Sequence, residues 1–242
     1  MDVKVAGVGS VPNGDYNHVS ASGNIELFGL VKCKSIVAKG KIKGESLECQ
    51  KSAKLSGNAT FSGKVTAQEL KASGKAAFGS DAFVKKSLRL SGDVKCTGDM
   101  KAEDINSSGA LSVGGDIEAD KLKIKGALHC EGFIHAKETD IRFNSKTRLG
   151  TVNSSKVAIR LKTGKKILQC IYLFPLFMKK LRARTIVNMG ISGDDVQVEH
   201  IVCPRVTGKK VRIGRGCKID LVQYSEEIKI SKNSKVGKVE KI

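Results

Sequence analysis

The sequence contains no tryptophan, few other aromatic residues and only three prolines among its 242 residues. Aromatic side chains fill much of an ordinary core, so their scarcity predicts a narrow core of Ala, Val, Ile and Leu. So few prolines are also unusual for a β-sandwich of this length. Hydrophobic residues nevertheless make up 40% of the chain, which excludes wholesale disorder.

Signals for secretion, membrane spanning and metal binding are also missing. The opening stretch MDVKVAGVGSVPNGDY has no basic region followed by an apolar one, so we expect no secretory signal. No apolar run reaches the roughly 18–20 residues that span a bilayer. The seven cysteines show no CxxC spacing, which disfavours zinc and a disulfide framework. We expect them to be reduced thiols of a cytosolic protein.

Acidic residues are few relative to basic ones. The chain has 43 Lys and Arg against 24 Asp and Glu, a formal net charge of +19. This excess predicts an anionic partner surface, whether a membrane, a nucleic acid or an acidic protein. The alternative is a lysine-rich surface that keeps an elongated fold soluble.

A repeat of 17 or 18 residues organises most of the chain. In the copy that starts at Gly57, three pairs of residues alternate with mostly polar ones: Ala59/Phe61, Val65/Ala67 and Leu70/Ala72. The spacing of two within a pair points both side chains to one side of a strand, and the longer spacing between pairs leaves a corner. The pattern predicts an all-β fold, a three-sided β-solenoid with 17–18-residue coils. The marker glycines of the successive copies are Gly23, Gly40, Gly57, Gly74, Gly92, Gly109 and Gly126.

Stacking of such coils predicts ladders of inward side chains. Cys96, Val113 and Cys130 share one inward site, which indicates core filling and not a metal or redox pair. Two further ladders are expected, one of Ala59, Ala76, Val94, Leu111 and Leu128, the other of Leu70, Leu88, Ile105, Leu122 and Ile141.

The repeat is interrupted once and resumes near the C-terminus. The sequence therefore predicts four parts: an N-terminal segment (1–14), a β-solenoid (15–163), an apolar and basic insertion (164–190) and a short C-terminal solenoid segment (191–242).

No convergent set of catalytic groups is visible. His18, His129, His135 and His200 are scattered, and there is no P-loop, GxSxG or HExxH motif. We therefore expect a protein that is not an enzyme, with no cofactor, metal or small-molecule substrate. Two alternatives stay open. A hexapeptide-type acyltransferase also has about 18 residues per coil, but the 6-5-6 rhythm disfavours it. A basic nucleic-acid-binding solenoid is disfavoured because stacking platforms of exposed aromatics are lacking.

The repeated coil, as in SGDVKCTGDMKAEDINSSG (91–109) and GGDIEADKLKIKG (114–126), resembles bactofilins, the bacterial polymer-forming cytoskeletal proteins. The closing stretch VTGKKVRIGRGCKIDLVQYSEEI (206–228) is similar to the tail of bactofilin-like proteins of low-GC Gram-positive bacteria. The resemblance implies a right-handed triangular β-helix that assembles end to end into non-polar filaments without nucleotide. Such filaments lie in the cytoplasm at the inner membrane and serve as scaffolds for cell shape, the envelope or motility. The partner would be a second copy or a paralogue, and the insertion is a departure from the family.

The first candidate surface is the N-terminal coil. Terminal coils of a solenoid expose unpaired backbone N–H and C=O groups unless a polar cap covers them. We expect self-assembly through the coil formed by Val19, Ala21, Ile25 and Leu27, unless residues 1–14 fold over it.

The second candidate surface is the insertion. Residues 141–193 contain twelve Lys and Arg and no Asp or Glu, and the apolar stretch ILQCIYLFPLFM (167–178) lies among them. Such a segment suits the interface of an anionic membrane, and packing against the solenoid is the alternative. The residues expected to make this membrane or partner attachment are Lys165, Lys166, Leu168, Ile171, Leu173, Phe174, Leu176, Phe177, Lys179, Lys180, Arg182 and Arg184.

Overall fold

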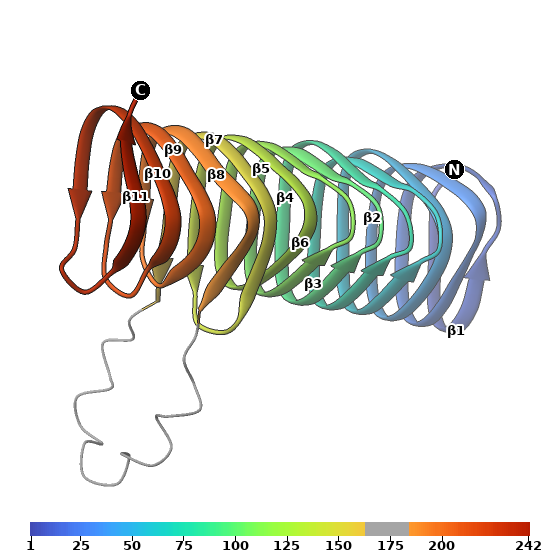
Figure 1. The fold of residues 1–242 in the computed structure, drawn as a ribbon. Helices are drawn as coiled ribbons and strands as arrows, with labels where there is room; N and C mark the ends of the chain where they lie inside the picture. Colours follow the sequence, from blue (N-terminus) through green and yellow to red (C-terminus); the bar gives the residue numbers. More distant parts are fainter. Residues whose placement is uncertain (163–183) are drawn as a thin grey trace, which may run out of the picture.

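The computed structural model describes residues 1–162 and 184–242, and these form an all-β solenoid of about 13 turns (Figure 1). The strands of the described residues make one parallel sheet in which each strand lies between its neighbours in sequence. The predicted β-solenoid is therefore confirmed. Its right hand and its three sides stay predictions.

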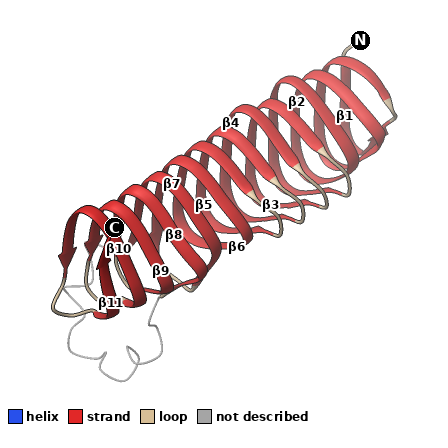
Figure 2. Cartoon of the chain, turned by 45° about the horizontal axis from the view of Figure 1, so that its top comes forward, coloured by secondary structure: helices blue, strands red, loops and turns tan. Residues whose placement is uncertain are grey.

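Among the described strands, β2 with 48 residues and β6 with 27 run through more than one coil, because the chain bends at its corners without leaving the sheet (Figure 2). The strand bounds are β1 Val3–Val11, β2 Gly14–Phe61, β3 Val65–Phe78, β4 Ala82–Cys96, β5 Met100–Val113, β6 Ile117–Phe143, β7 Thr147–Leu161, β8 Thr185–Val198, β9 Ile201–Ile213, β10 Lys218–Ile230 and β11 Lys235–Lys241.

The inward ladders follow the predicted register with one exception. Ala59, Ala76, Val94, Leu111 and Leu128 stack in that order and are all buried. The second ladder runs as predicted from Leu70 through Leu88 and Ile105 to Leu122.

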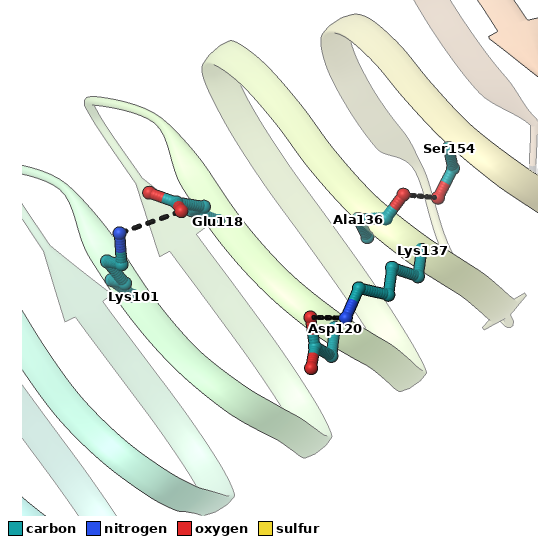
Figure 3. Close-up of polar contacts among 6 residues, drawn as sticks. All are labelled: Lys101, Glu118, Asp120, Ala136, Lys137 and Ser154. Carbon is teal, nitrogen blue, oxygen red and sulfur yellow. Dashed lines mark hydrogen bonds and ion pairs between the residues drawn. The ribbon is translucent and has the colours of Figure 1, made fainter.

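The last member of that second ladder was predicted wrongly as Ile141. The buried pair that follows Leu122 and Ile124 is Thr139 and Ile141, and an ion pair of 2.9 Å between Asp120 and Lys137 marks the 17-residue offset on the outer surface (Figure 3). Thr139 therefore takes the place next to Leu122. A polar residue was not expected in the core, but the Thr139 hydroxyl is hydrogen-bonded to the Ser154 hydroxyl at 2.8 Å.

The marker glycines form a ladder of their own at one corner. All seven, from Gly23 to Gly126, have φ between 98° and 145°, a region that side chains with a Cβ rarely adopt. A Cβ on any of them would also lie well under 3 Å from the backbone of the glycine in the preceding coil. Both constraints require glycine, and they explain the regular spacing that the sequence shows.

Two of the predicted domain bounds are corrected by the strand pairing. Residues 1–14 are not a separate segment, because β1 lies on β2 in register from Val3↔Val19 to Val11↔Leu27. The solenoid also resumes at Thr185, inside the predicted insertion, and β8 pairs directly with β7. The C-terminal part is therefore not a second solenoid but continues the same stack.

Candidate assembly interface at the two solenoid ends

The N-terminal end of the stack is an open strand edge. Within the described chain β1 pairs with β2 alone, so its outer side carries a row of backbone groups without sheet partners. Val3 and Val5 are only partly buried there, and Val8 is 85% exposed. Tyr16 lies behind this edge, and its hydroxyl donates a hydrogen bond to the Pro12 carbonyl at 2.8 Å.

The four residues predicted to form this end are in fact covered. Val19, Ala21, Ile25 and Leu27 face β1 and are at most 3% exposed. The prediction was wrong because the stretch VKVAGVGSV hides the pattern: Ala6 and Val8 stand where the next coil has the polar residues Ser22 and Asn24, and Gly9 takes the inward place of Ile25. The outermost coil contains β1 and lies one turn before the coil of Val19 and Leu27.

The C-terminal end is a second open edge. β11 is the last strand and pairs with β10 alone among the described residues. The side chains of Ile228 and Val236 are partly buried, and those of Ile230 and Val239 are 40% and 45% exposed. No capping helix is found in residues 184–242.

The apolar residues of the two ends belong to the same inward ladder. Val3 and Val5 stack on Val19 and Ala21 at the start, and Ile228 and Ile230 stack on Val211 and Ile213 at the finish. Between them the ladder passes, among others, through Leu70, Leu88, Ile105, Leu122, Thr139, Val157 and Val196. If the N-terminal end of one copy stacked on the C-terminal end of another, its Val3 and Val5 would take the next place after Ile228 and Ile230.

The charges at the two ends have opposite signs. Counting side chains only, residues 1–17 carry two Asp and one Lys, a net charge of −1, and the last 17 residues, 226–242, carry five Lys and three Glu, a net charge of +2. All three glutamates are already paired: Glu226 with Lys210, Glu227 with Lys229 and Glu240 with Lys238. Contact between unlike ends is therefore attractive, whereas contact between two C-terminal ends brings like charges together.

The predicted attachment residues of the insertion lie almost wholly outside the described residues. These are Lys165, Lys166, Leu168, Ile171, Leu173, Phe174, Leu176, Phe177, Lys179, Lys180 and Arg182. Arg184 is described: it is exposed directly before β8, and its carbonyl accepts a hydrogen bond from the Thr147 N–H at 3.2 Å.

The histidines contact different residues at separate places on the solenoid. His18 lies 2.6 Å from the Ser35 hydroxyl, His129 lies 3.3 Å from the Glu131 carboxylate, and the His135 ring stacks on Phe133. Within the described ranges no three His, Cys, Asp or Glu residues are grouped for a metal ion. The same ranges hold no helix with the length and apolar character needed to cross a bilayer.

A cysteine pair that the sequence did not reveal lies near the N-terminal end. Cys33 and Cys49 are both buried in β2, and the Cys49 thiol donates a hydrogen bond to the Lys34 carbonyl at 3.5 Å. The interaction between the two cysteine side chains lowers the pKa of Cys49 and raises that of Cys33. The two stand 16 positions apart: Cys33 lies in the copy that starts at Gly23, and Cys49 lies in the copy that starts at Gly40, whose middle pair sits one residue early. The period of 17 or 18 residues alone could therefore not pair them. By contrast, Cys96 and Cys130 are separated by Val113, as predicted.

Cys49 is expected to be the most reactive of the described cysteines. Cys49 is a core residue that is only 3% exposed, but the interaction with Cys33 lowers its pKa and so favours the reactive thiolate. Burial raises the pKa of Cys96 and Cys203 to about 11 and that of Cys130 to about 12, so these stay thiols. Iodoacetamide at pH 8, followed by peptide mass mapping, should label Cys49 first, with a rate that falls as the pH is lowered. Equal labelling of Cys49 and Cys96 would contradict the assignment.

No protein-family model, curated protein or solved structure matches this chain. Function must therefore be inferred from the solenoid itself. Its two open ends are the surfaces at which a second copy would continue the backbone pairing and the inward ladder without any change of fold.

Proposed function

We propose that this chain is a non-enzymatic bacterial scaffold protein that polymerises through the ends of its solenoid, as its resemblance to bactofilins implies. The observation that supports this most directly is that both ends are open strand edges with partly exposed apolar side chains. Solenoids that stay monomeric cover such edges with polar caps. The scaffold would lie in the cytoplasm at the inner membrane, with the insertion residues between Lys165 and Arg184 as its attachment segment.

The preferred contact joins unlike ends. The side chains of residues 1–17 carry a net charge of −1 and those of residues 226–242 carry +2, and only this arrangement continues the ladders from Ile228 and Ile230 to Val3 and Val5 of the next copy. A filament built in this way is polar. It would differ in this respect from the non-polar filaments that the family resemblance implies.

Each contact should be of moderate strength. Full burial of one Val or Ile side chain contributes about 1.5–3 kcal/mol, and backbone hydrogen bonds along the edge add to this. Association costs about 4–15 kcal/mol in lost freedom. We therefore expect assembly at micromolar concentrations, growing weaker as salt screens the attraction between the ends.

Ile230→Lys should abolish end-to-end assembly, because it places a charge on the edge where the next coil would stack. Val37→Lys is the matched control, since Val37 is 38% exposed, close to the 40% of Ile230, but lies on the side of the solenoid. Sedimentation velocity at micromolar concentration should show oligomers for the wild type and for Val37→Lys, and monomers for Ile230→Lys. A wild type that stays monomeric at every concentration and salt would count against the scaffold function.

The polarity of the contact can be tested with two single-cysteine additions. Val3→Cys and Ile230→Cys place a thiol at the N-terminal and C-terminal edges. When the two variants are mixed and treated with a short bismaleimide, cross-links should join Cys at position 3 to Cys at position 230 in different chains. Cross-links of position 3 to position 3 would show contact between N-terminal ends and overturn the polar arrangement.

A further inference from the structure

Two neighbouring rows on the outer surface form a strip of cations that we call the basic strip. It consists of Lys39, Lys54, Lys71, Arg89, Lys123 and Lys125, all of which are exposed. One row stacks Lys54, Lys71, Arg89, Asn106 and Lys123 in register, and the other stacks Ser56, Ser73, Ser91, Ser108 and Lys125. Neither row has an acidic residue over these coils.

Other outer rows of the same solenoid avoid this arrangement. Glu138, Lys156, Asp195, Lys210 and Glu227 stack in register with alternating sign. On β5 and β6, Lys101 forms an ion pair of 2.7 Å with Glu118 of the next coil (Figure 3). The fold therefore allows basic and acidic side chains of neighbouring coils to pair wherever the sequence places them next to each other.

In the basic strip such neighbours are missing between Lys54 and Lys123; Asp140, which follows Lys123 in the next coil, is paired with Arg142 and Arg160. Within the described chain none of its six cations forms an ion pair. Glu69 and Asp104 lie beyond it, at the start of the same strand segments, and do not reach these cations. Because like charges on directly paired strands repel, the stack of Lys54, Lys71 and Arg89 opposes folding. An external anion would relieve this repulsion.

The middle of the strip is hollowed and lined with hydrogen-bond donors. A shallow depression of about 260 Å³ is bordered by Lys71, Arg89, Lys123 and Lys125, with the hydroxyls of Ser91 and Ser108 in its wall. Ammonium, guanidinium and hydroxyl groups are the donors that phosphate oxygens accept. The depression has the chemistry of a phosphate site within a wider basic surface.

The form of the surface favours a membrane over a nucleic acid. The strip follows the side of a straight stack of coils, so a planar array of headgroups can touch all of its cations at once (Figure 2). None of the residues in its two rows is aromatic, whereas single-strand binders rely on aromatic stacking. Clustered Lys and Arg residues recognise anionic phospholipid surfaces.

We propose that the basic strip docks the side of the solenoid onto an anionic phospholipid membrane, with the long axis parallel to the bilayer and a lipid phosphate in the depression. This inference deepens the proposed membrane location and rests on it. It assigns the contact to the solenoid itself and not only to the insertion. Rods aligned in this way keep both ends free, so docking and end-to-end assembly do not compete.

The test compares two triple variants of equal charge. Lys71→Gln/Arg89→Gln/Lys123→Gln removes three cations of the basic strip, and Lys43→Gln/Lys75→Gln/Lys95→Gln removes three exposed cations on the strand segments beyond the glycine corner. Partitioning onto phosphatidylglycerol/phosphatidylcholine vesicles should fall on the order of 100-fold for the strip variant and far less for the control. Both are measured in the Ile230→Lys background, so that loss of assembly and loss of docking are separate results.

Each outcome decides the matter. Equal losses for the two variants would show attraction to net charge alone and overturn the proposal. Unchanged vesicle binding by the strip variant, with loss only in Phe174→Glu/Phe177→Glu, would assign docking to the insertion instead. If the wild type does not bind the vesicles but binds duplex DNA at 50 mM salt, and the strip variant loses this DNA binding, the strip is a nucleic-acid surface. If the wild type bound pure phosphatidylcholine vesicles as well as the anionic ones, docking would not depend on anionic lipid, and the proposal would be overturned.

Discussion

Leu122→Asp is expected to unfold the solenoid at room temperature. Leu122 is fully buried in a ladder between Ile105 and Thr139, and loss of a buried leucine alone costs about 2–5 kcal/mol. A carboxylate left in that position would be desolvated and have no cation beside it, which adds several kcal/mol. Because a coil is stable only when stacked on its neighbours, a break at this point removes support from both sides. Circular dichroism should show loss of the β signal.

The residue next in sequence provides the control. Lys123 is exposed, and its change to Asp removes a cation from a surface where like charges already repel each other. Lys123→Asp should therefore change the free energy of unfolding by no more than about 0.5 kcal/mol. If Leu122→Asp and Lys123→Asp melted at the same temperature, the assignment of inward and outward residues would be wrong.

Gly92→Ala is expected to have the second largest effect. Gly92 has φ of 103°, where an alanine is strained by about 1–3 kcal/mol. Its Cβ would also collide with the Gly74 carbonyl in the coil below, and backbone cannot move aside as a side chain can. The two coils would have to separate, which weakens the hydrogen bonds between β3 and β4. A lower melting temperature, with amide exchange fastest in Val65–Cys96, should report this.

Gly7→Ala separates the two causes. Gly7 has a similar φ of 83° but nothing within 4 Å of the position of a Cβ, since β1 is the outermost strand of the described residues. It should therefore show only the strain, and a much smaller loss of stability than Gly92→Ala. Equal losses at the two positions would mean that the stacked carbonyl contributes nothing. In assembled filaments a next copy would lie against Gly7, so this comparison is made under monomeric conditions.

The period of the glycines was the strongest feature of the sequence. A glycine is required at each corner by both its φ and the carbonyl beneath it, so the spacing of Gly23 to Gly126 reports the length of one coil directly. Two-residue alternation gives the inward side in the same way, and the ladder from Ala59 to Leu128 was predicted without error. Both features are local and repeat at every coil.

Predictions failed where a copy of the repeat departs from the pattern. β1 was missed because Ala6 and Val8 occupy positions that are polar in the next coil, and Gly9 occupies an inward one. Thr139 was missed because its burial depends on Ser154, a residue of the next coil. The pairing of Cys33 with Cys49 needed the register across an irregular copy. In each case the deciding contact joins residues of different coils. The identity of one residue does not indicate which residue of another coil it will contact.

The sequence by itself determined the coil length, the inward and outward sides of most strands, and the all-β solenoid. Only the tertiary structure decided which coil is the last at each end, and which outward cations stand next to one another. The physical reason is that alternation and glycine corners act within a coil, where sequence neighbours are spatial neighbours. The open edges at Val3–Val11 and Lys235–Lys241, and the row of Lys54, Lys71 and Arg89, exist only once the coils are stacked.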